Sequence, residues 1–129
     1  MTYQSLSPFD GKLIKGFVEL TASEYETRLA KAQACFETWR HTSFAERAAI
    51  IHKASKLLYE QKDAFAHTMT LEMGKRISEA RSEVEYSSRI LAYYAKHAEH
   101  FLAPVKLDPV HGKAHIENSP IGVIFAVEP

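Results

Sequence analysis

The sequence predicts an α/β protein that is mostly helical over this stretch. Two Ser/Thr-x-x-Glu capping boxes precede long segments in which apolar residues recur at helical spacing. Short segments that alternate apolar and polar residues lie on either side of these helices and are typical of strands. Residues 120–129 form an almost uninterrupted apolar run, which is typical of a strand covered on both faces in a parallel sheet.

Composition indicates one globular domain. The 129 residues suffice for a single core, and 16 Lys and Arg are balanced by 16 Asp and Glu, so the excess basic charge of a nucleic-acid-binding surface is missing. No apolar run reaches the roughly 18 residues of a membrane helix, and the first residues lack the pattern of a signal peptide. We therefore expect a cytoplasmic protein that binds neither nucleic acid nor membrane.

Residues 1–20 are expected to form a small hairpin. Asp10-Gly11 supplies a turn between short runs that end in Leu13-Ile14 and Phe17-Val18. An isolated two-stranded hairpin is only marginally stable in water. This one should therefore lie against a larger element.

The first helix is expected to begin at the capping box Thr21-Ala22-Ser23-Glu24. Apolar residues then recur at spacings of four, three, four and three, which places them on one helix face. They are Tyr25, Leu29, Ala32, Phe36 and Trp39. The single cysteine, Cys35, lies at the flank of this face and excludes an internal disulfide. A structural thiol is favoured there over a nucleophile.

A second capping box, Ser43-Phe44-Ala45-Glu46, begins the next helical segment. Its apolar stripe continues beyond residue 60, and periodicity leaves open whether one helix or two, separated near residues 61–63, occupy this length. Gly74 is a suitable C-terminal stop. The stripe consists of Ile50, Ile51, Ala54, Leu57, Leu58, Ala64, Phe65, Thr68, Met69 and Leu71.

The last helix is expected to begin at Ile77 or Ser78 and to end before Pro104. One face should pack in the core, and the charged residues opposite should be solvated. The core-facing set is Ala80, Val84, Ser87 or Ser88, Leu91, Tyr94 or Ala95, Ala98 and Leu102. Residues 105–108 and 113–117 then alternate apolar and polar residues around a turn, which predicts two half-buried strands.

The residues by themselves indicate no reaction centre. His97 and His100 are three apart on a helix, but no further ligands complete a metal site. Glu83 and Glu85 are two apart, so they point in different directions. No glycine-rich phosphate loop is present. We therefore expect no catalytic residue and no metal ligand in this chain.

Several motifs, in order, resemble the aldehyde dehydrogenase family. The first is Glu72-Met73-Gly74-Lys75, and the resemblance then covers most of the chain. The others are Phe36-Glu37-Thr38-Trp39-Arg40, Glu46-Arg47-Ala48, the stretches 77–84 and 93–95, and the closing run 120–129. The combination of Met73, the run 93–99 and Val127-Glu128-Pro129 is most similar to the succinate-semialdehyde dehydrogenase branch. Two departures are Arg76, where that branch usually has proline, and Ser82, where glycine is common.

The resemblance implies the N-terminal part of an enzyme that oxidises an aldehyde, in this branch succinate semialdehyde, with NAD or NADP. A cysteine thiolate attacks the aldehyde, and hydride transfer and hydrolysis of the thioester follow. The family's catalytic cysteine, glutamate and glycine-rich loop lie further along the chain than residue 129. Cys35 does not match the catalytic position. The 129-residue chain alone is therefore expected to be inactive.

The resemblance also implies a domain plan. Residues 1–129 would be the N-terminal part of the NAD(P)-binding domain, and 120–129 the first strand of its Rossmann-like sheet. Residues 105–118 would begin an oligomerisation arm, so the full-length parent is expected to be a homodimer or homotetramer. Val127, Glu128 and Pro129 match positions that line the cofactor cleft, at the carboxyl end of a parallel strand.

The alternative is a non-catalytic α-rich interaction module. Without a sheet, the five large apolar side chains of 121–127 would each forgo about 1.5 to 3 kcal/mol of burial, roughly 10 kcal/mol in total. That is comparable with the whole stability of a domain, about 5 to 15 kcal/mol. The magnitude favours the dehydrogenase.

Overall fold

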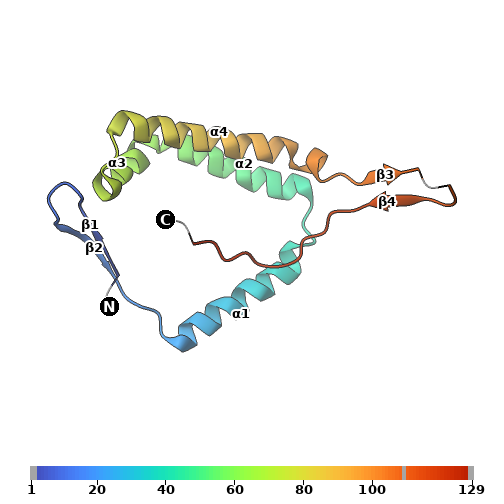
Figure 1. Cartoon of the computed structure of the whole chain (residues 1–129), viewed down its shortest axis with the longest axis horizontal. Helices are drawn as coiled ribbons and strands as arrows, with labels where there is room; N and C mark the ends of the chain where they lie inside the picture. The colour runs from blue at the N-terminus through green and yellow to red at the C-terminus, as the bar shows by residue number, and fades with distance from the viewer. Residues whose placement is uncertain (1–2, 109, 128–129) are drawn as a thin grey trace.

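The computed structural model describes residues 3–108 and 110–127 (Figure 1). Two hairpins flank a set of four helices, and each hairpin is its own two-stranded antiparallel sheet. The order is β1 (Tyr3–Leu6), β2 (Leu13–Phe17), α1 (Ala22–Trp39), α2 (Phe44–Glu60), α3 (Lys62–Met73), α4 (Ile77–Phe101), β3 (Val105–Leu107) and β4 (Ala114–Ile116).

The core lies where α4 packs on α2 and α3. Small side chains dominate it: of the described residues, the buried ones are Ser55, Ala66, Ala80, Val84 and Ser88. Small residues let helix backbones approach closely, and α4 packs extensively on both α2 and α3. The structure confirms Ala80 and Val84 as core residues of α4 and selects Ser88 over Ser87. Leu102, expected in the core, is exposed because α4 ends just before it.

The structure separates the long second segment into two helices. The break falls at Gln61, whose ψ of 17° departs from helical geometry, and α3 starts immediately after it. Gly74 ends α3 in the left-handed conformation, with φ 69°, as predicted. The helix stop therefore depends on a residue without a Cβ.

Both capping boxes form. The Thr21 hydroxyl accepts a hydrogen bond from the Glu24 N–H at 3.2 Å, and the Glu24 carboxylate accepts from the Thr21 N–H at 2.8 Å. Ser43 and Glu46 repeat this geometry at the start of α2. The two helix starts predicted from sequence are thus confirmed.

Helix α1 is formed but not buried. None of its residues is buried, and Tyr25, Leu29 and Trp39 on its predicted apolar face are exposed. In Figure 1, α1 lies apart from the α2–α4 layer, with the closing stretch of the chain between them. The predicted helix is confirmed, and its apolar face is not buried by the other described residues.

The predicted hairpins are confirmed. Tyr3 pairs with Phe17 in the first, and a register irregularity lies between Ser5 and Leu6. In the second, Val105 pairs with Ile116. Its strands are exposed on both faces rather than half-buried, because the ribbon projects beyond the end of α4 (Figure 1).

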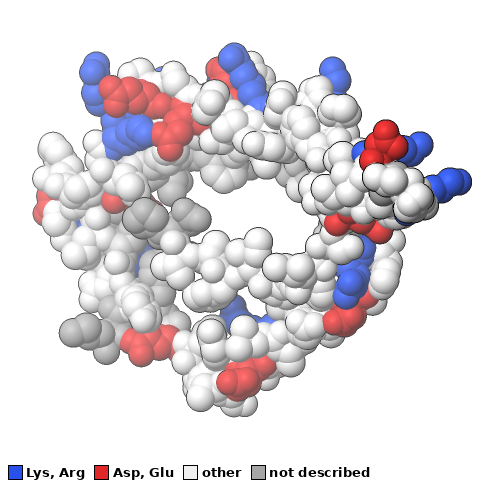
Figure 2. All heavy atoms as spheres, turned by 45° about the vertical axis from the view of Figure 1, so that its right-hand side comes forward, with Lys and Arg blue, Asp and Glu red and all other residues white. Residues whose placement is uncertain are grey.

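The closing run is neither a strand nor buried in this structure. No residue of 117–127 is assigned to a strand, and Ile121 and Ile124 are 101% and 88% exposed. A strand exists only through pairing with another, and none of the described residues pairs with this run. Figure 2 shows an opening through the molecule whose rim is mostly free of charged atoms.

Replacing Glu24 and Glu46 by Gln tests the caps. Hydrogen bonds from the backbone and side chain of Thr21 and of Ser43 hold the pKa of each carboxyl below its ordinary value of 4.5. A lowered folded pKa means stabilisation that is present above pH 4.5 and is lost as pH falls through the folded value. The double variant should therefore lose less helical circular dichroism than the unmodified chain between pH 5 and pH 2.

Glu26→Gln, on α1 outside the cap, is the matched control. It should follow the unmodified chain through the titration. If the acid transition of the Glu24/Glu46 double variant were unchanged, the capping carboxylates would not contribute to the loss of helix at low pH.

Arg76→Pro should raise the free energy of unfolding. Arg76 precedes α4 with φ −59° and ψ 131°, angles that proline adopts without strain, and proline restricts the unfolded chain. The gain should be about 0.4 to 1 kcal/mol in urea unfolding. Arg76→Ala removes only the exposed 3.5 Å ion pair with Glu79 and should change little. A loss of stability specific to proline would contradict the backbone argument.

Candidate functional site

The predicted cofactor-binding residues lie at the end of the described chain. Val127 is 79% exposed, and Glu128 and Pro129 lie outside the described residues. In Figure 1 the closing stretch runs from β4 into the space between α1 and the α2–α4 layer. None of the backbone hydrogen bonds formed by described residues involves 119–127, so a partner bound to the backbone of this stretch would displace no described backbone hydrogen bond.

The reactive side chains considered from sequence do not converge. Cys35 is exposed on α1, a helix in which no residue is buried, and the preference for a structural thiol over a nucleophile stays a prediction. Glu83 pairs with Lys75, whereas Glu85 pairs with Arg89, which confirms that the two carboxylates point apart. His97 lies between aromatic rings, 4.6 Å from Tyr93 and 5.9 Å from Phe101 between centroids.

A metal site is not formed by the part of the chain that the structure describes. No group of three or more His, Cys, Asp or Glu side chains there is arranged to hold an ion. Nor is any described helix long and apolar enough to cross a membrane.

Lowered carboxyl pKa values occur at structural positions. The Lys12 ammonium, 2.7 Å from Asp10, lowers the pKa of that carboxyl in the turn of the first hairpin. The other two lowered values belong to the capping glutamates of α1 and α2. These shifts reflect turn and cap formation rather than acid–base chemistry.

Sequence analysis did not anticipate an apolar groove between α2 and α4. Its volume is about 370 Å³, and Arg47 lies in it with the guanidinium carbon 4.5 Å from the Phe44 ring centroid. The sequence pattern that could have indicated this groove is the spacing of Phe44 and Arg47, which lie one helical turn apart. Other lining residues include Ile51, Leu91, Ala95, Ala98 and Leu102. Most of this lining is apolar, although Tyr94, Lys96 and Glu99 also belong to it, so the groove offers a surface mainly for apolar contacts.

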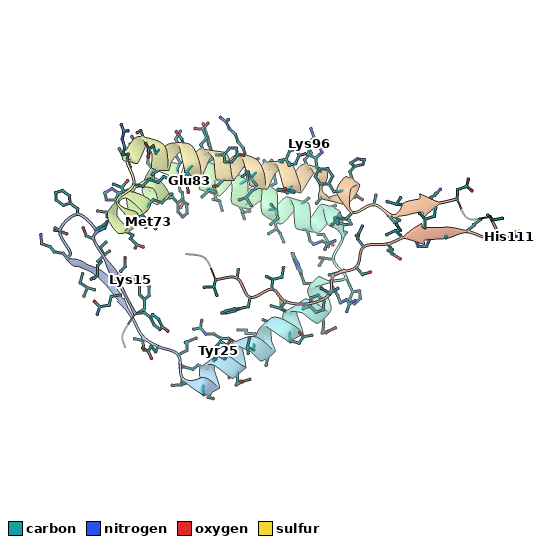
Figure 3. All side chains as sticks on the ribbon, in the orientation of Figure 1. Lys15, Tyr25, Met73, Glu83, Lys96 and His111 are labelled. Atoms are coloured by element: carbon teal, nitrogen blue, oxygen red, sulfur yellow. The ribbon has the colours of Figure 1, made fainter. Side chains whose placement is uncertain are left out.

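A second cavity, of about 780 Å³, lies between the first hairpin and the end of α3. Met73, labelled in Figure 3, lies where α3 meets the turn of this hairpin. A Cβ built on Gly74 would lie 3.1 Å from Cγ of Pro8. Met73 and Gly74 of the Glu-Met-Gly-Lys motif thus belong to the surface against which the hairpin packs. Such a surface is expected, because an isolated hairpin is only marginally stable.

Gly74→Ala should lower the free energy of unfolding by about 1 kcal/mol or more, because an alanine at φ 69° is strained and its methyl group crowds Pro8. Urea unfolding of Gly74→Ala, Pro8→Ala and the double variant separates these causes. The double variant should regain the part of the lost free energy of unfolding that is due to crowding of Pro8, but not the part that is due to the positive φ. Full recovery would contradict the backbone contribution, and Gly11→Ala, at φ 71° with open space around it, reports the φ effect alone.

A comparison with protein families matches residues 1–129 to the model described as the aldehyde dehydrogenase family. The match covers every helix and strand of the structure.

Individual relatives carry the same signal. The NADP(+) succinate-semialdehyde dehydrogenase of Deinococcus radiodurans is 33% identical over 98% of this chain. The corresponding enzyme of Mycobacterium leprae is 36% identical over the whole chain, and a probable one of Synechocystis is 34% identical. The chain spans between about a quarter and a third of the length of these relatives, 27 to 29%.

Solved structures agree. Gox0499 superposes with a TM-score of 0.91 at 32% identity over 94% of this chain and 27% of its own. The succinic semialdehyde dehydrogenase of Streptococcus pyogenes, solved with NADP+, gives 0.83 at 31% identity over 88% of this chain and 25% of its own. These likenesses confirm the predicted α/β fold of the aldehyde dehydrogenase type.

Proposed function

The chain belongs to the aldehyde dehydrogenase family, and on this premise we propose that it is the N-terminal part of the NAD(P)-binding domain of an enzyme that oxidises an aldehyde to a carboxylic acid. The observation that carries the proposal is the match over all 129 residues, which includes the closing run 120–129. That run has the composition of a strand buried in a parallel sheet, yet it is unpaired and exposed in the described residues.

The proposed substrate is succinate semialdehyde. Support comes from the relatives of Deinococcus radiodurans and Mycobacterium leprae that are named succinate-semialdehyde dehydrogenases and that align with essentially the whole chain. The proposed cofactor is NADP, because those relatives are named for NADP(+) and the Streptococcus pyogenes structure was solved with it. NAD is the alternative, to be distinguished by assay.

The cofactor's place fits the exposed backbone at the end of the closing run. In an open α/β sheet, ligands bind outside the carboxyl ends of the strands, and Val127 lies at that end of the predicted strand. Its exposed backbone can donate to a dinucleotide without displacing a described hydrogen bond. Bound there, NADP supplies the hydride acceptor for the reaction.

The contributions proposed for this chain are structural and orienting. Ile121, Val123 and Phe125 would anchor the first strand in the sheet, and Val127, Glu128 and Pro129 would border the cofactor. The nucleophilic cysteine and the general base would come from a part of the enzyme outside 1–129, because Cys35, which is exposed on α1, does not match the family's catalytic position.

The remaining proposals concern assembly and location. The exposed β3–β4 ribbon, in residues 105–118, would belong to an oligomerisation arm of a homodimer or homotetramer. His111 lies at the tip of this ribbon, away from the helices, in Figure 3. Such an enzyme would act in the cytoplasm on a small aldehyde.

A chimaera tests the function. Residues 1–129 replace the aligned stretch of the Deinococcus radiodurans relative, and formation of reduced cofactor is followed with succinate semialdehyde and either NADP or NAD. The chimaera should be active and should prefer NADP, whereas residues 1–129 alone should form no reduced cofactor. Oxidation of the aldehyde by residues 1–129 alone would contradict the proposal.

Within the chimaera, Ile124→Asp should abolish activity, because it places a charge in a strand that is buried once the sheet is complete. Lys96→Asp, on the outer side of α4 in Figure 3, is the matched control and should retain activity. Equal activity of both variants would count against burial of the closing run.

The second candidate, an α-rich interaction module, is favoured by one observation: the chain exposes large apolar side chains on α1 and on the closing run. It predicts an inactive chimaera. The family match favours the dehydrogenase.

A further inference from the structure

The groove between α2 and α4 contains an arginine that lacks an acceptor. The Nε of Arg47 is buried, and no hydrogen-bond partner for it exists among the described residues. Its guanidinium carbon lies 4.5 Å from the Phe44 ring centroid. Glu99 lines the same groove, but none of the ion pairs formed by the described residues joins it to Arg47. Because a buried donor on a charged group is costly to leave unpaired, Arg47 requires an acceptor from elsewhere.

A carboxylate is the acceptor that suits this arginine. A guanidinium presents its N–H groups in a planar fork that matches the two oxygens of a carboxylate, and such a pair is stronger than a neutral hydrogen bond. The charged side chains that line the groove are two cations, Arg47 and Lys96, and one anion, Glu99. The groove is therefore complementary to a carboxylate that is surrounded by apolar groups.

The apolar surface beside Arg47 is open to a further layer of protein. Ile51, Tyr94 and Leu102 line the groove and are still 37%, 55% and 45% exposed. A contiguous exposed apolar patch with polar residues at its rim marks a contact with another surface. The chain spans 27 to 29% of the length of its relatives, so residues outside 1–129 would supply most of the surface of the proposed enzyme.

We propose that a segment of the full-length enzyme outside 1–129 docks in this groove and pairs an Asp or Glu carboxylate with Arg47, with apolar side chains on either side of that carboxylate. This inference rests on the proposed function in one respect, namely that 1–129 is part of a longer aldehyde dehydrogenase. Apolar contacts supply most of the attraction. Arg47 supplies the selectivity, because a neutral or basic side chain opposite it would leave the guanidinium buried without a counter-charge.

Thiol labelling tests whether the groove is covered. Ala45→Cys places a thiol at an exposed position that lines the groove, and Lys53→Cys, also exposed on α2 but not part of the lining, is the matched control. Both are made with Cys35→Ser, in residues 1–129 and in the chimaera with the Deinococcus radiodurans relative. Mass spectrometry of the peptide that contains each thiol gives its labelling rate, and circular dichroism checks that each variant is folded.

The thiol at position 45 should react freely in residues 1–129 and at least about tenfold more slowly in the chimaera, because a docked segment must open before the reagent enters. The thiol at position 53 should react alike in both proteins. If the thiol at position 45 also reacts at the same rate in both, no segment covers the groove and the proposal is overturned.

Zero-length cross-linking identifies the acceptor. Arg47→Lys keeps the positive charge and supplies an amine, which a carbodiimide joins only to a carboxylate in direct contact with it. In the chimaera, the product should have the mass of one chain and should join position 47 to an Asp or Glu outside 1–129. A link to Glu99, a product with the mass of two chains, or no link at position 47 would each overturn the proposal.

Activity of the chimaera separates this proposal from the proposed function. A protected and cross-linked groove in an inactive chimaera would refute the function and support the docking. An active chimaera whose groove stays open to the thiol reagent would refute the docking alone.

Discussion

The close packing of α4 on α2 and α3 is the constraint on which the rest of the described chain depends. Its buried residues are serine, alanine and valine, so helix axes can approach and backbone carbonyls come within reach of side-chain hydroxyls. The first hairpin lies against the end of α3, and the second follows the end of α4. Ion pairs of α4 with Asp63 and Lys75 hold its first half from outside.

This arrangement explains how a chain with so little buried apolar surface still has defined elements. Helices α1 and α2 start at capping boxes, and α3 ends on a left-handed glycine; these local interactions need no core. Helix α1 is the clearest example, because it is complete at both ends and yet has no buried residue. Local chemistry defines the elements, whereas packing defines only the α2–α4 layer.

The same division explains what could be predicted from sequence. Thr21, Ser43, Gly74 and Pro104 marked helix ends correctly, because each acts on its own neighbours in the chain.

Burial was predicted less well. The faces of α1 and of the closing run read as core because of their composition, but burial requires a surface opposite them, and the described residues provide none. The groove beside Arg47 escaped notice because it is formed by two helices that are distant in sequence. For the candidate site, the family could be inferred from ordered motifs, whereas Val127 gained no contact that would identify its role.

The uncovered face of α1 gives the chain an unusual optical property. Trp39 is the single tryptophan, it lies in the last turn of α1, and it is 40% exposed. Tryptophan emission therefore reports on water around the end of α1 and not on the helices that form the core. Fluorescence and circular dichroism therefore observe different parts of this molecule. Trp39 emission changes when another surface packs on α1, whereas circular dichroism follows mainly the helices of the α2–α4 layer. If the two signals gave different unfolding transitions, the difference would first have to be ascribed to the parts of the molecule that they observe, and only then to an unfolding intermediate.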